Sequence, residues 1–174
     1  MSHLSDSIRS VPGFPKPGIN FKDITTLLKD AKAFAAAIEE FYTLYKDERI
    51  DKVVCIESRG FILGAPLAYK LGAGFVPIRK KGKLPAATIA ESYALEYGID
   101  SIEIHKDAIN PGERILLHDD LLATGGTMQA AVRLVEELGG TVVGIAFLIE
   151  LEPLKGREKL EAYKVNSLIK YDED

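Results

Sequence analysis

The sequence predicts an α/β fold in which a mostly parallel, twisted sheet is flanked by helices. Short apolar runs of strand length recur at residues 53–56, 75–78 and 114–117. Segments with helical spacing of their apolar residues lie between these runs, and this alternation is typical of doubly wound parallel sheets. Polar or glycine-rich turns follow the three strands, so we expect ligands to bind beyond the carboxyl ends of the strands.

The composition is that of an ordinary globular protein, with 47% hydrophobic and 28% charged residues. The length predicts a single domain, 1–174. A formal net charge of -4 gives no support to a nucleic-acid partner, and no apolar stretch approaches membrane-spanning length. The first residues lack an apolar signal-peptide core, and the single Cys55 has no disulfide partner within the chain. We therefore expect a cytoplasmic protein with neither nucleic-acid nor membrane partners.

The first 45 residues predict a short helix, a stiff loop and a longer helix. Residues 5–9 favour a short polar helix. The run 11–18 holds three prolines and two glycines, which excludes a regular helix or a central strand and predicts a structured loop. In residues 31–45, aromatic and aliphatic side chains recur at spacings of four, three and four. That spacing predicts one face of an amphipathic helix.

The rest of the chain continues the alternation of strands and helices. Helices are predicted at 61–71 and 127–138, the second stopped by two glycines. Between them, residues 79–98 form a long, polar segment of flexible composition, and residues 101–105 alternate as in an antiparallel strand. A further strand is predicted at 141–148.

The segment 115–127 carries the most information about function. A buried strand delivers Asp119 and Asp120, and a Thr-Gly-Gly-Thr turn then opens a helix. The glycines allow close approach of an anion, and the exposed N–H groups and the helix dipole favour a phosphate. The two carboxylates can accept hydrogen bonds from a ribose diol. We interpret this unit as a site for a phosphorylated sugar, although the Gly-Gly-Thr turn alone would favour a helix N-cap beside solvated acids.

Residues 117–127 resemble the phosphoribosyl-pyrophosphate binding motif of type I phosphoribosyltransferases, in the variant of the adenine-specific branch. The resemblance implies that family's fold, with a small N-terminal hood at about 1–30 and a mobile lid loop at about 80–100. It makes Asp119 and Asp120 catalytic residues that face the ribose hydroxyls. His118 stands where the family usually has an apolar residue, and we expect no catalytic role for it. The residues that the resemblance assigns to the 5-phosphate are Ala123, Thr124, Gly125, Gly126 and Thr127.

Two further segments resemble the family's pyrophosphate side. Ser58, Arg59 and Gly60 follow a strand and match its pyrophosphate loop, whereas alone they would suggest an ordinary strand-to-helix turn. Residues 79–83 put four cations into five positions, a pattern that is usually a solvated surface. By the resemblance, Arg79 and Lys83 bind substrate. In relatives this arginine reaches across a dimer interface, which implies a homodimer with Arg79 supplied in trans.

Residues 91–98 resemble the lid of the same family. Closure has a physical purpose, because glycosyl transfer passes through a cationic transition state that water would capture. The resemblance makes Glu96 a catalytic residue near the base, for proton management or charge stabilisation, and makes Tyr97 a substrate contact. Without the resemblance, both residues would be interpreted as parts of a surface loop.

Residues 14–24 resemble the hood segment of the adenine-specific branch. The resemblance implies that Phe21 stacks on adenine while backbone groups around Asn20 and Lys22 pair with the base. The structural alternative is that Phe14 and Phe21 merely fill the core. The likeness extends to residues 151–160 and covers nearly the whole chain.

The implied reaction transfers the 5-phosphoribosyl group from 5-phosphoribosyl 1-pyrophosphate to N9 of adenine, forming AMP and pyrophosphate in purine salvage. Mg²⁺ would bridge pyrophosphate and ribose oxygens, held mainly through substrate and water. One alternative is a phosphoribosyltransferase for a 6-oxo purine, xanthine or hypoxanthine, which would want a donor against O6. Another is a non-catalytic regulator that senses 5-phosphoribosyl 1-pyrophosphate and binds DNA or RNA; such proteins usually carry an appended basic segment.

Overall fold

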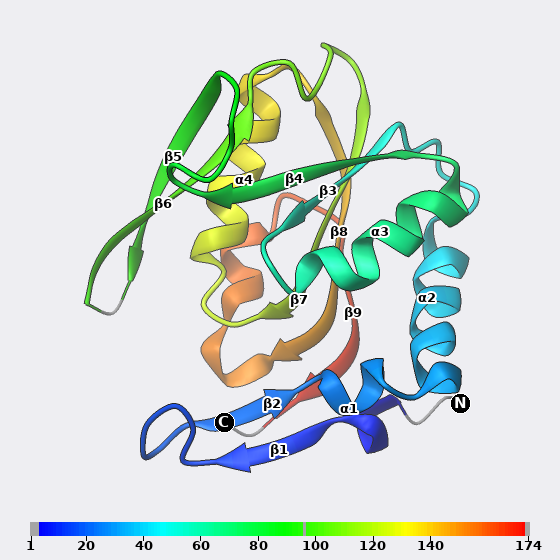
Figure 1. Ribbon diagram of the computed structural model, residues 1–174, viewed down its shortest axis with the longest axis vertical. Helices are drawn as coiled ribbons and strands as arrows, with labels where there is room; N and C mark the ends of the chain where they lie inside the picture. Colours follow the sequence, from blue (N-terminus) through cyan, green and yellow to red (C-terminus); the bar gives the residue numbers. More distant parts are fainter. Residues whose placement is uncertain (1–3, 96, 173–174) are drawn as a thin grey trace.

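A seven-stranded sheet of order β5-β6-β4-β3-β7-β8-β9 forms the centre of the computed structural model, which describes residues 4–95 and 97–172 (Figure 1). From β4 to β9 the neighbouring strands are parallel, and β6 and β5 continue one edge in antiparallel fashion. The strands are β1 Arg9–Pro12, β2 Asn20–Asp23, β3 Lys52–Ile56, β4 Gly74–Lys80, β5 Thr88–Leu95, β6 Gly98–His105, β7 Arg114–Leu122, β8 Thr141–Leu151 and β9 Val165–Tyr171. The helices are α1 Thr25–Leu28, α2 Ala31–Tyr45, α3 Gly60–Leu71 and α4 Gly126–Glu137, with 3-10 turns η1 Leu4–Ser7, η2 Glu152–Leu154 and η3 Gly156–Leu160.

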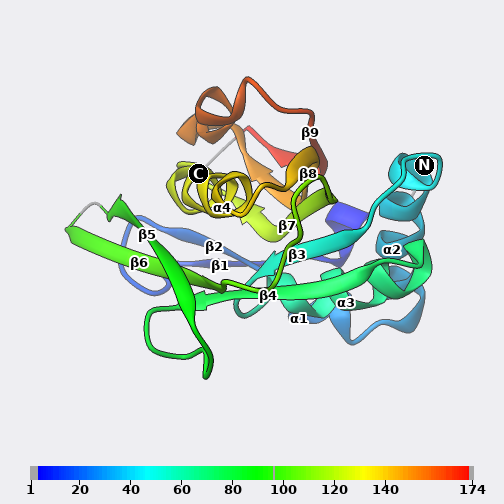
Figure 2. The same cartoon turned by 90° about the horizontal axis from the view of Figure 1, so that it is seen from above.

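Helices cover both faces of the sheet, as the sequence predicts. Helices α2 and α3 pack on one face and α4 on the other, and each face has its own apolar cluster (Figure 2). Because both faces are covered, the central strands are nearly continuous apolar runs. Helix α2 has the predicted bounds and begins where the Asp30 carboxylate accepts hydrogen bonds from the N–H groups of Lys32 and Ala33, at 2.8 and 3.1 Å.

The N-terminal segment differs from the prediction. Strands β1 and β2 form a separate antiparallel hairpin, which lies beyond the carboxyl ends of the central strands (Figure 1). The expected loop therefore begins at Gly13 rather than at Val11, and the expected helix 5–9 is only the short turn η1. Pro12 is tolerated because it ends a strand with a single partner.

Much of the long, polar segment 79–98 is strand in the structure. Residues Thr88–Leu95 form β5, which pairs along its whole length with β6. We call these two strands the β5–β6 ribbon. Only one side of β5 packs against the body, through Tyr93 and Ile89. Three of its other six side chains are polar and two are alanines, so the composition resembles that of a loop even though the backbone is extended.

Strand β7 is longer than predicted and includes the paired aspartates. The pairing with β8 continues past them, with Asp119 opposite Phe147 and Leu122 opposite Glu150. Polar side chains do not end a strand whose neighbour still offers backbone partners. Strand β9 was not predicted from the sequence. In the described part of the chain, no helix is both long and apolar enough to cross a membrane.

Candidate active site

The two aspartates of β7 both lie near the start of α3. Asp120 is 7% exposed and accepts a hydrogen bond of 2.6 Å from Nε of Arg59, which precedes α3. Asp119 lines a cavity beyond the end of β7. A β-carbon at Gly60 would lie 2.9 Å from Oδ1 of Asp119. Glycine at this position therefore lets α3 begin directly against the carboxylate.

The two carboxylates influence one another electrostatically. Burial and the negative charge of Asp120 raise the pKa of Asp119 well above its ordinary value, although Arg59 opposes this. The Oδ1 atom of Asp119 also accepts a hydrogen bond of 2.8 Å from the N–H of Asp120. Carboxylate oxygens can each accept more than one hydrogen bond. Such a pair suits a vicinal diol.

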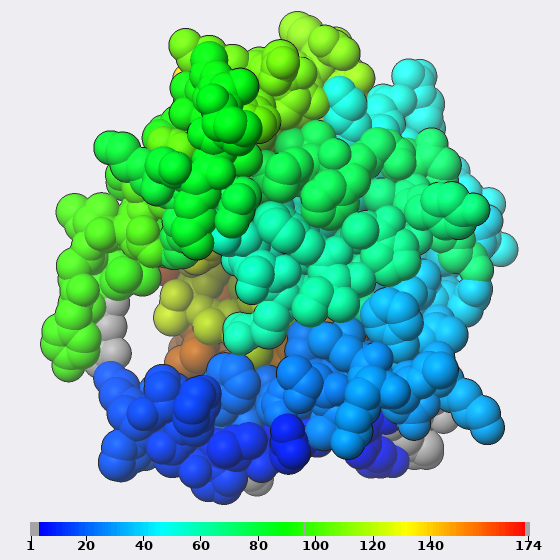
Figure 3. Space-filling model, in the orientation of Figure 1, coloured from blue at the N-terminus to red at the C-terminus, as the bar shows by residue number. Residues whose placement is uncertain are grey.

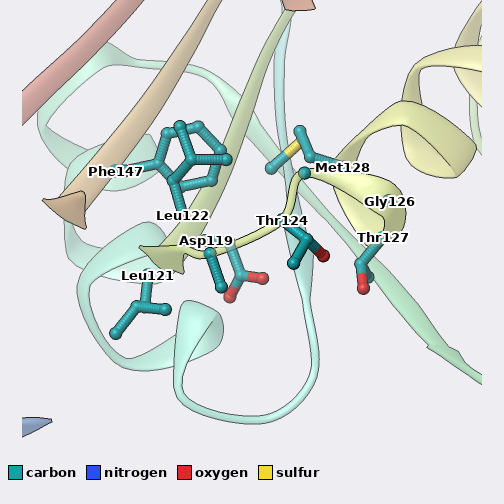
Figure 4. A pocket seen from close by; sticks show the side chains of 10 residues that line it. Asp119, Leu121, Leu122, Thr124, Gly126, Thr127, Met128 and Phe147 are labelled. Atoms are coloured by element: carbon teal, nitrogen blue, oxygen red, sulfur yellow. The ribbon is translucent and has the colours of Figure 1, made fainter. Parts of the chain in front are cut away.

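The turn between β7 and α4 has the form of an anion site. We call residues 123–127 the phosphate loop. Gly125 has φ +82°, a conformation that favours glycine, and α4 begins at the next residue. The oxygen-bearing side chains of Asp119, Thr124 and Thr127 lie apart from the apolar group of Phe147, Leu122 and Met128 (Figure 4). The cavity of about 90 Å³ thus combines hydroxyls with the positive end of a helix dipole.

A larger cleft of about 360 Å³ joins this cavity to two neighbouring strand ends. Its lining brings together residues from the turn after β3, from β7 and from the start of α4. Among the predicted site residues it includes Ser58, Arg59, Asp119, Asp120 and Thr127. The space-filling view shows the hollow between the N-terminal hairpin and the β5–β6 ribbon (Figure 3). The expected convergence of the strand ends is therefore confirmed.

An apolar pocket borders the cleft on the hairpin side. The rings of Phe14 and Phe21 meet edge to face at 5.2 Å, and the Arg59 guanidinium lies 5.4 Å from the centre of the Phe21 ring. Phe14 is 51% exposed, so it does not fill the core. The side chain of Lys22 points away, with Nζ 4.2 Å from the centre of the Tyr171 ring. Asn20 Oδ1 is buried and has no hydrogen-bond partner among the described residues.

The predicted cations gather on Glu57. Arg79 Nη2 and Lys83 Nζ lie 3.3 and 3.2 Å from its carboxylate, and the N–H of Lys80 donates to it at 2.5 Å. Burial opposes ionisation of Glu57, but these hydrogen bonds and charges keep its pKa below the ordinary value. Arg79 and Lys83 do not line the cleft in the single chain.

Sequence analysis missed Lys80, Tyr93 and Asp100. Lys80 and Tyr93 line the cleft. Lys80 Nζ donates to the Tyr93 hydroxyl at 2.5 Å and forms an ion pair with Asp100. The signal was the alternation along β4: Val76 and Ile78 are buried, so Lys80 falls on the same face as they do.

The two predicted lid residues lie differently in the structure. Glu96 is outside the described residues. Tyr97 is 82% exposed, and its ring centre lies 5.6 Å from Nζ of Lys16 in the N-terminal hairpin. Tyr97 therefore approaches the hairpin from the tip of the β5–β6 ribbon, and it does not line the cleft.

The residues around the cleft offer few direct ligands for magnesium. Among residues 4–95 and 97–172, no three histidine, cysteine, aspartate or glutamate side chains are grouped so as to hold a metal ion. Asp120 is already paired with Arg59. Mg²⁺ commonly keeps waters and substrate phosphates as most of its ligands. The site therefore fits an ion that arrives with its substrate.

Comparison with known proteins agrees with this geometry. A family model described as "Phosphoribosyl transferase domain" matches residues 22–173. An adenine phosphoribosyltransferase from Clostridium kluyveri is 60% identical over 170 residues, which is 98% of this chain and 99% of that protein. The crystal structure of the Thermoanaerobacter pseudethanolicus adenine phosphoribosyltransferase has a TM-score of 0.94 and 56% identity, covering 97% of this chain and 98% of the other.

A more distant structure carries ligands. The Saccharomyces cerevisiae adenine phosphoribosyltransferase, complexed with an imino-altritol bisphosphate and adenine, has a TM-score of 0.90 and 40% identity, covering 95% of this chain and 96% of the other. Since the family model and these relatives match nearly the whole length, the chain belongs to the phosphoribosyltransferase family, in the branch of the adenine phosphoribosyltransferases.

Proposed function

We propose that the chain transfers the 5-phosphoribosyl group from 5-phosphoribosyl 1-pyrophosphate to N9 of adenine, releasing AMP and pyrophosphate in purine salvage. The observation that carries the proposal is the junction of the carboxylate pair with the phosphate loop at the end of β7. An aromatic pocket for a flat base adjoins the same cleft through Arg59. The yeast relative was crystallised with adenine, which supports the choice of base.

Each part of the site has a role in this reaction. The phosphate loop, Ala123 to Thr127, binds the 5-phosphate, and Asp119 and Asp120 accept hydrogen bonds from the ribose hydroxyls. Their negative charge also stabilises the cationic ribose as the bond from C1 to pyrophosphate loosens. Ser58, Arg59, Gly60 and Lys83 bind the leaving pyrophosphate, Arg59 through its guanidinium.

Positioning accounts for much of the rate enhancement, because it holds N9 of the base in line with C1. Magnesium would be held mainly through substrate oxygens and water, because the described residues offer it no group of ligands, and it would supply neutralisation of charge on the leaving group. Phe21 stacks on adenine, and backbone groups of Asn20 and Lys22 pair with its amino group and N1. Glu96 and Tyr97 belong to a lid that excludes water during transfer.

The active form is a cytoplasmic homodimer in which Arg79 of one subunit reaches the pyrophosphate site of the other. Arg79 does not line its own cleft, in keeping with this arrangement. Two inactive variants, Arg79→Ala and Asp120→Asn, can be mixed under subunit exchange. Half of the dimers are then hybrids with one intact site, so about a quarter of the parent activity returns. No recovery in verified hybrids rules out the trans arrangement.

The base and the sugar roles are tested by steady-state kinetics with Mg²⁺. We expect adenine to be used far more efficiently than hypoxanthine, xanthine or guanine, because a 6-oxo base presents an acceptor where adenine donates. Asp120→Asn should lower kcat/KM by about 100-fold or more. Faster turnover of a 6-oxo purine contradicts the adenine assignment, and undetectable AMP synthesis with tight RNA or DNA binding favours a regulator.

A further inference from the structure

The back of the phosphate loop rests on a segment that the reaction scheme leaves without a role. Gly156 begins η3 and is buried. A β-carbon at Gly156 would collide with the carbonyl oxygen of Ala123 and lie 3.0 Å from the backbone nitrogen of Gly125. A β-carbon at Gly125 would in turn lie 2.5 Å from the carbonyl oxygen of Gly156. The two backbones therefore touch directly, and no side chain fits between them.

An ion pair between the partly exposed Arg157 and the buried Glu150 holds this segment in place. Arg157 Nε donates to Glu150 Oε1 at 2.9 Å, and its Nη1 donates to the carbonyl oxygen of Val165 at 2.8 Å. Glu150, in β8, is 4% exposed and also accepts a hydrogen bond of 2.7 Å from Ser167 Oγ. Arg157 thus ties η3 to both β8 and β9. A charge buried this far is costly to leave unpaired.

Two neighbouring residues show that the turn is tightly specified. Lys155 has φ +53°, which lies in the left-handed region that a side chain disfavours. Leu160, at the end of η3, is fully buried in the apolar cluster beneath α4. The chain thus keeps a strained residue immediately before Gly156 and anchors the far end of η3 in the core. Such strain persists only where the surroundings impose it.

We propose that the Gly156–Arg157 turn is a positioning element for the phosphate loop: Gly156 forms its back wall, and the Arg157–Glu150 pair fixes that wall relative to the sheet. The inference rests on the proposed role of the loop in binding the 5-phosphate. Arg157 touches no substrate in this scheme. It acts by keeping the N–H groups of Ala123 to Gly125 aimed at the phosphate, where small displacements are costly.

The test measures binding of ribose 5-phosphate by calorimetry, together with KM for both substrates. Arg157→Ala should raise the Kd of ribose 5-phosphate and KM for 5-phosphoribosyl 1-pyrophosphate about tenfold, with KM for adenine changed less than about twofold. Arg157→Lys should recover part of the loss. The matched control is Arg114→Ala, at the start of β7, which also loses a carbonyl contact (2.8 Å, Arg49) and a glutamate partner (3.2 Å, Glu48). Its Kd should change by less than about twofold.

Equal effects of Arg157→Ala and Arg114→Ala on the Kd overturn the inference, as does an equal rise in both values of KM. If Arg157→Ala does not fold, Glu150→Gln, which keeps the shape of the side chain, replaces it with the same expected ranking. Thr127→Ala tests the underlying assignment separately, because its hydroxyl belongs to the loop itself. If Thr127→Ala binds ribose 5-phosphate as tightly as the parent, the proposed role of the loop is wrong. If Thr127→Ala binds it more weakly but Arg157→Ala binds it as tightly as the parent, only the inference about the Gly156–Arg157 turn is wrong.

Discussion

The phosphate loop and the β5–β6 ribbon both border the reaction cleft, yet they are held in opposite ways. The loop lies backbone to backbone against Gly156. The ribbon projects from the sheet edge, with Tyr97 and Ile99 82% and 77% exposed near its tip (Figure 1). A segment that binds the same phosphate throughout the reaction gains from rigidity, whereas one that must admit substrates needs few contacts to break. The packing therefore supports the proposal that the loop is a fixed binding element and the ribbon a movable cover.

Gly125→Ala should displace the phosphate loop and have the largest effect on stability and activity. The new methyl group meets the Gly156 carbonyl oxygen at 2.5 Å, and φ +82° is strained for alanine. Together these should cost about 2–4 kcal/mol of unfolding free energy. By displacing the loop they should also lower kcat/KM for 5-phosphoribosyl 1-pyrophosphate by about 100-fold or more. Urea unfolding and initial-rate kinetics measure the two quantities.

Gly112→Ala is the matched control for backbone strain. Gly112 has φ +85°, but nothing lies within 4 Å of an added β-carbon. We expect a loss of about 1 kcal/mol in unfolding free energy, with kcat/KM unchanged. If the two alanine variants lose activity equally, then contact with Gly156 is not what fixes the loop.

The strand that delivers the phosphate loop should also make the protein acid-sensitive through His118. The ring is fully buried, and its Nε2 has no hydrogen-bond partner among the described residues. Burial lowers the pKa of His118 from 6.5 to about 4, although Asp120 opposes this. Between these values the unfolded chain binds a proton that the folded chain does not. Stability therefore falls as the pH drops from 6.5 towards 4.

His118→Leu should remove that part of the acid sensitivity. At pH 5 the histidine costs about 2 kcal/mol of unfolding free energy relative to pH 7.5. The variant should not lose this unfolding free energy, while the contribution of the carboxylates to the pH dependence of stability should stay the same. Urea unfolding at both pH values, at equal protein concentration, measures the difference. If the variant loses as much unfolding free energy between pH 7.5 and pH 5 as the parent does, the prediction is wrong. The kcat/KM at pH 7.5 should stay near the parent value because His118 does not line the cleft.

The fold was predictable from the sequence wherever the pattern of apolar residues follows the burial of an element. The apolar run in β3 and the spacing in α2 each report packing directly, and their bounds were close to those observed. The β5–β6 ribbon was not predictable in this way. Its strand β5 packs on one side only, so the composition of this strand resembles that of a loop. Strand β1 was missed because Pro12 suggests a break, whereas a two-stranded hairpin tolerates it.

The site was predictable to the extent that short motifs carry its chemistry. Asp119, Asp120 and the phosphate loop lie in one run of sequence. In the structure Asp119 and the loop line one cavity, and Asp120 lines the adjoining cleft. Residues that act from a distance could not be found this way. Lys80 and Asp100 meet only because β4 pairs with β6. Gly156 contacts Gly125 across 31 positions of sequence, and nothing local to either residue indicates that contact.

Asp100→Asn changes the β5–β6 ribbon, and we expect it to have the smallest effect on activity. Asp100, in β6, pairs with Lys80, which lines the cleft, so it offsets a positive charge that would otherwise face the pyrophosphate. Removing its charge should lower KM for 5-phosphoribosyl 1-pyrophosphate about two- to fivefold, since partly exposed ion pairs are weak. The gain should shrink as salt rises from 0.05 to about 0.5 M. The control is Glu39→Gln. It removes a negative charge from an exposed ion pair between α2 and α3, with Lys70, and should leave KM unchanged. A raised KM in Asp100→Asn, with normal stability, means instead that Asp100 holds Lys80 in its binding position, and that the ribbon helps to organise the site as well as to cover it.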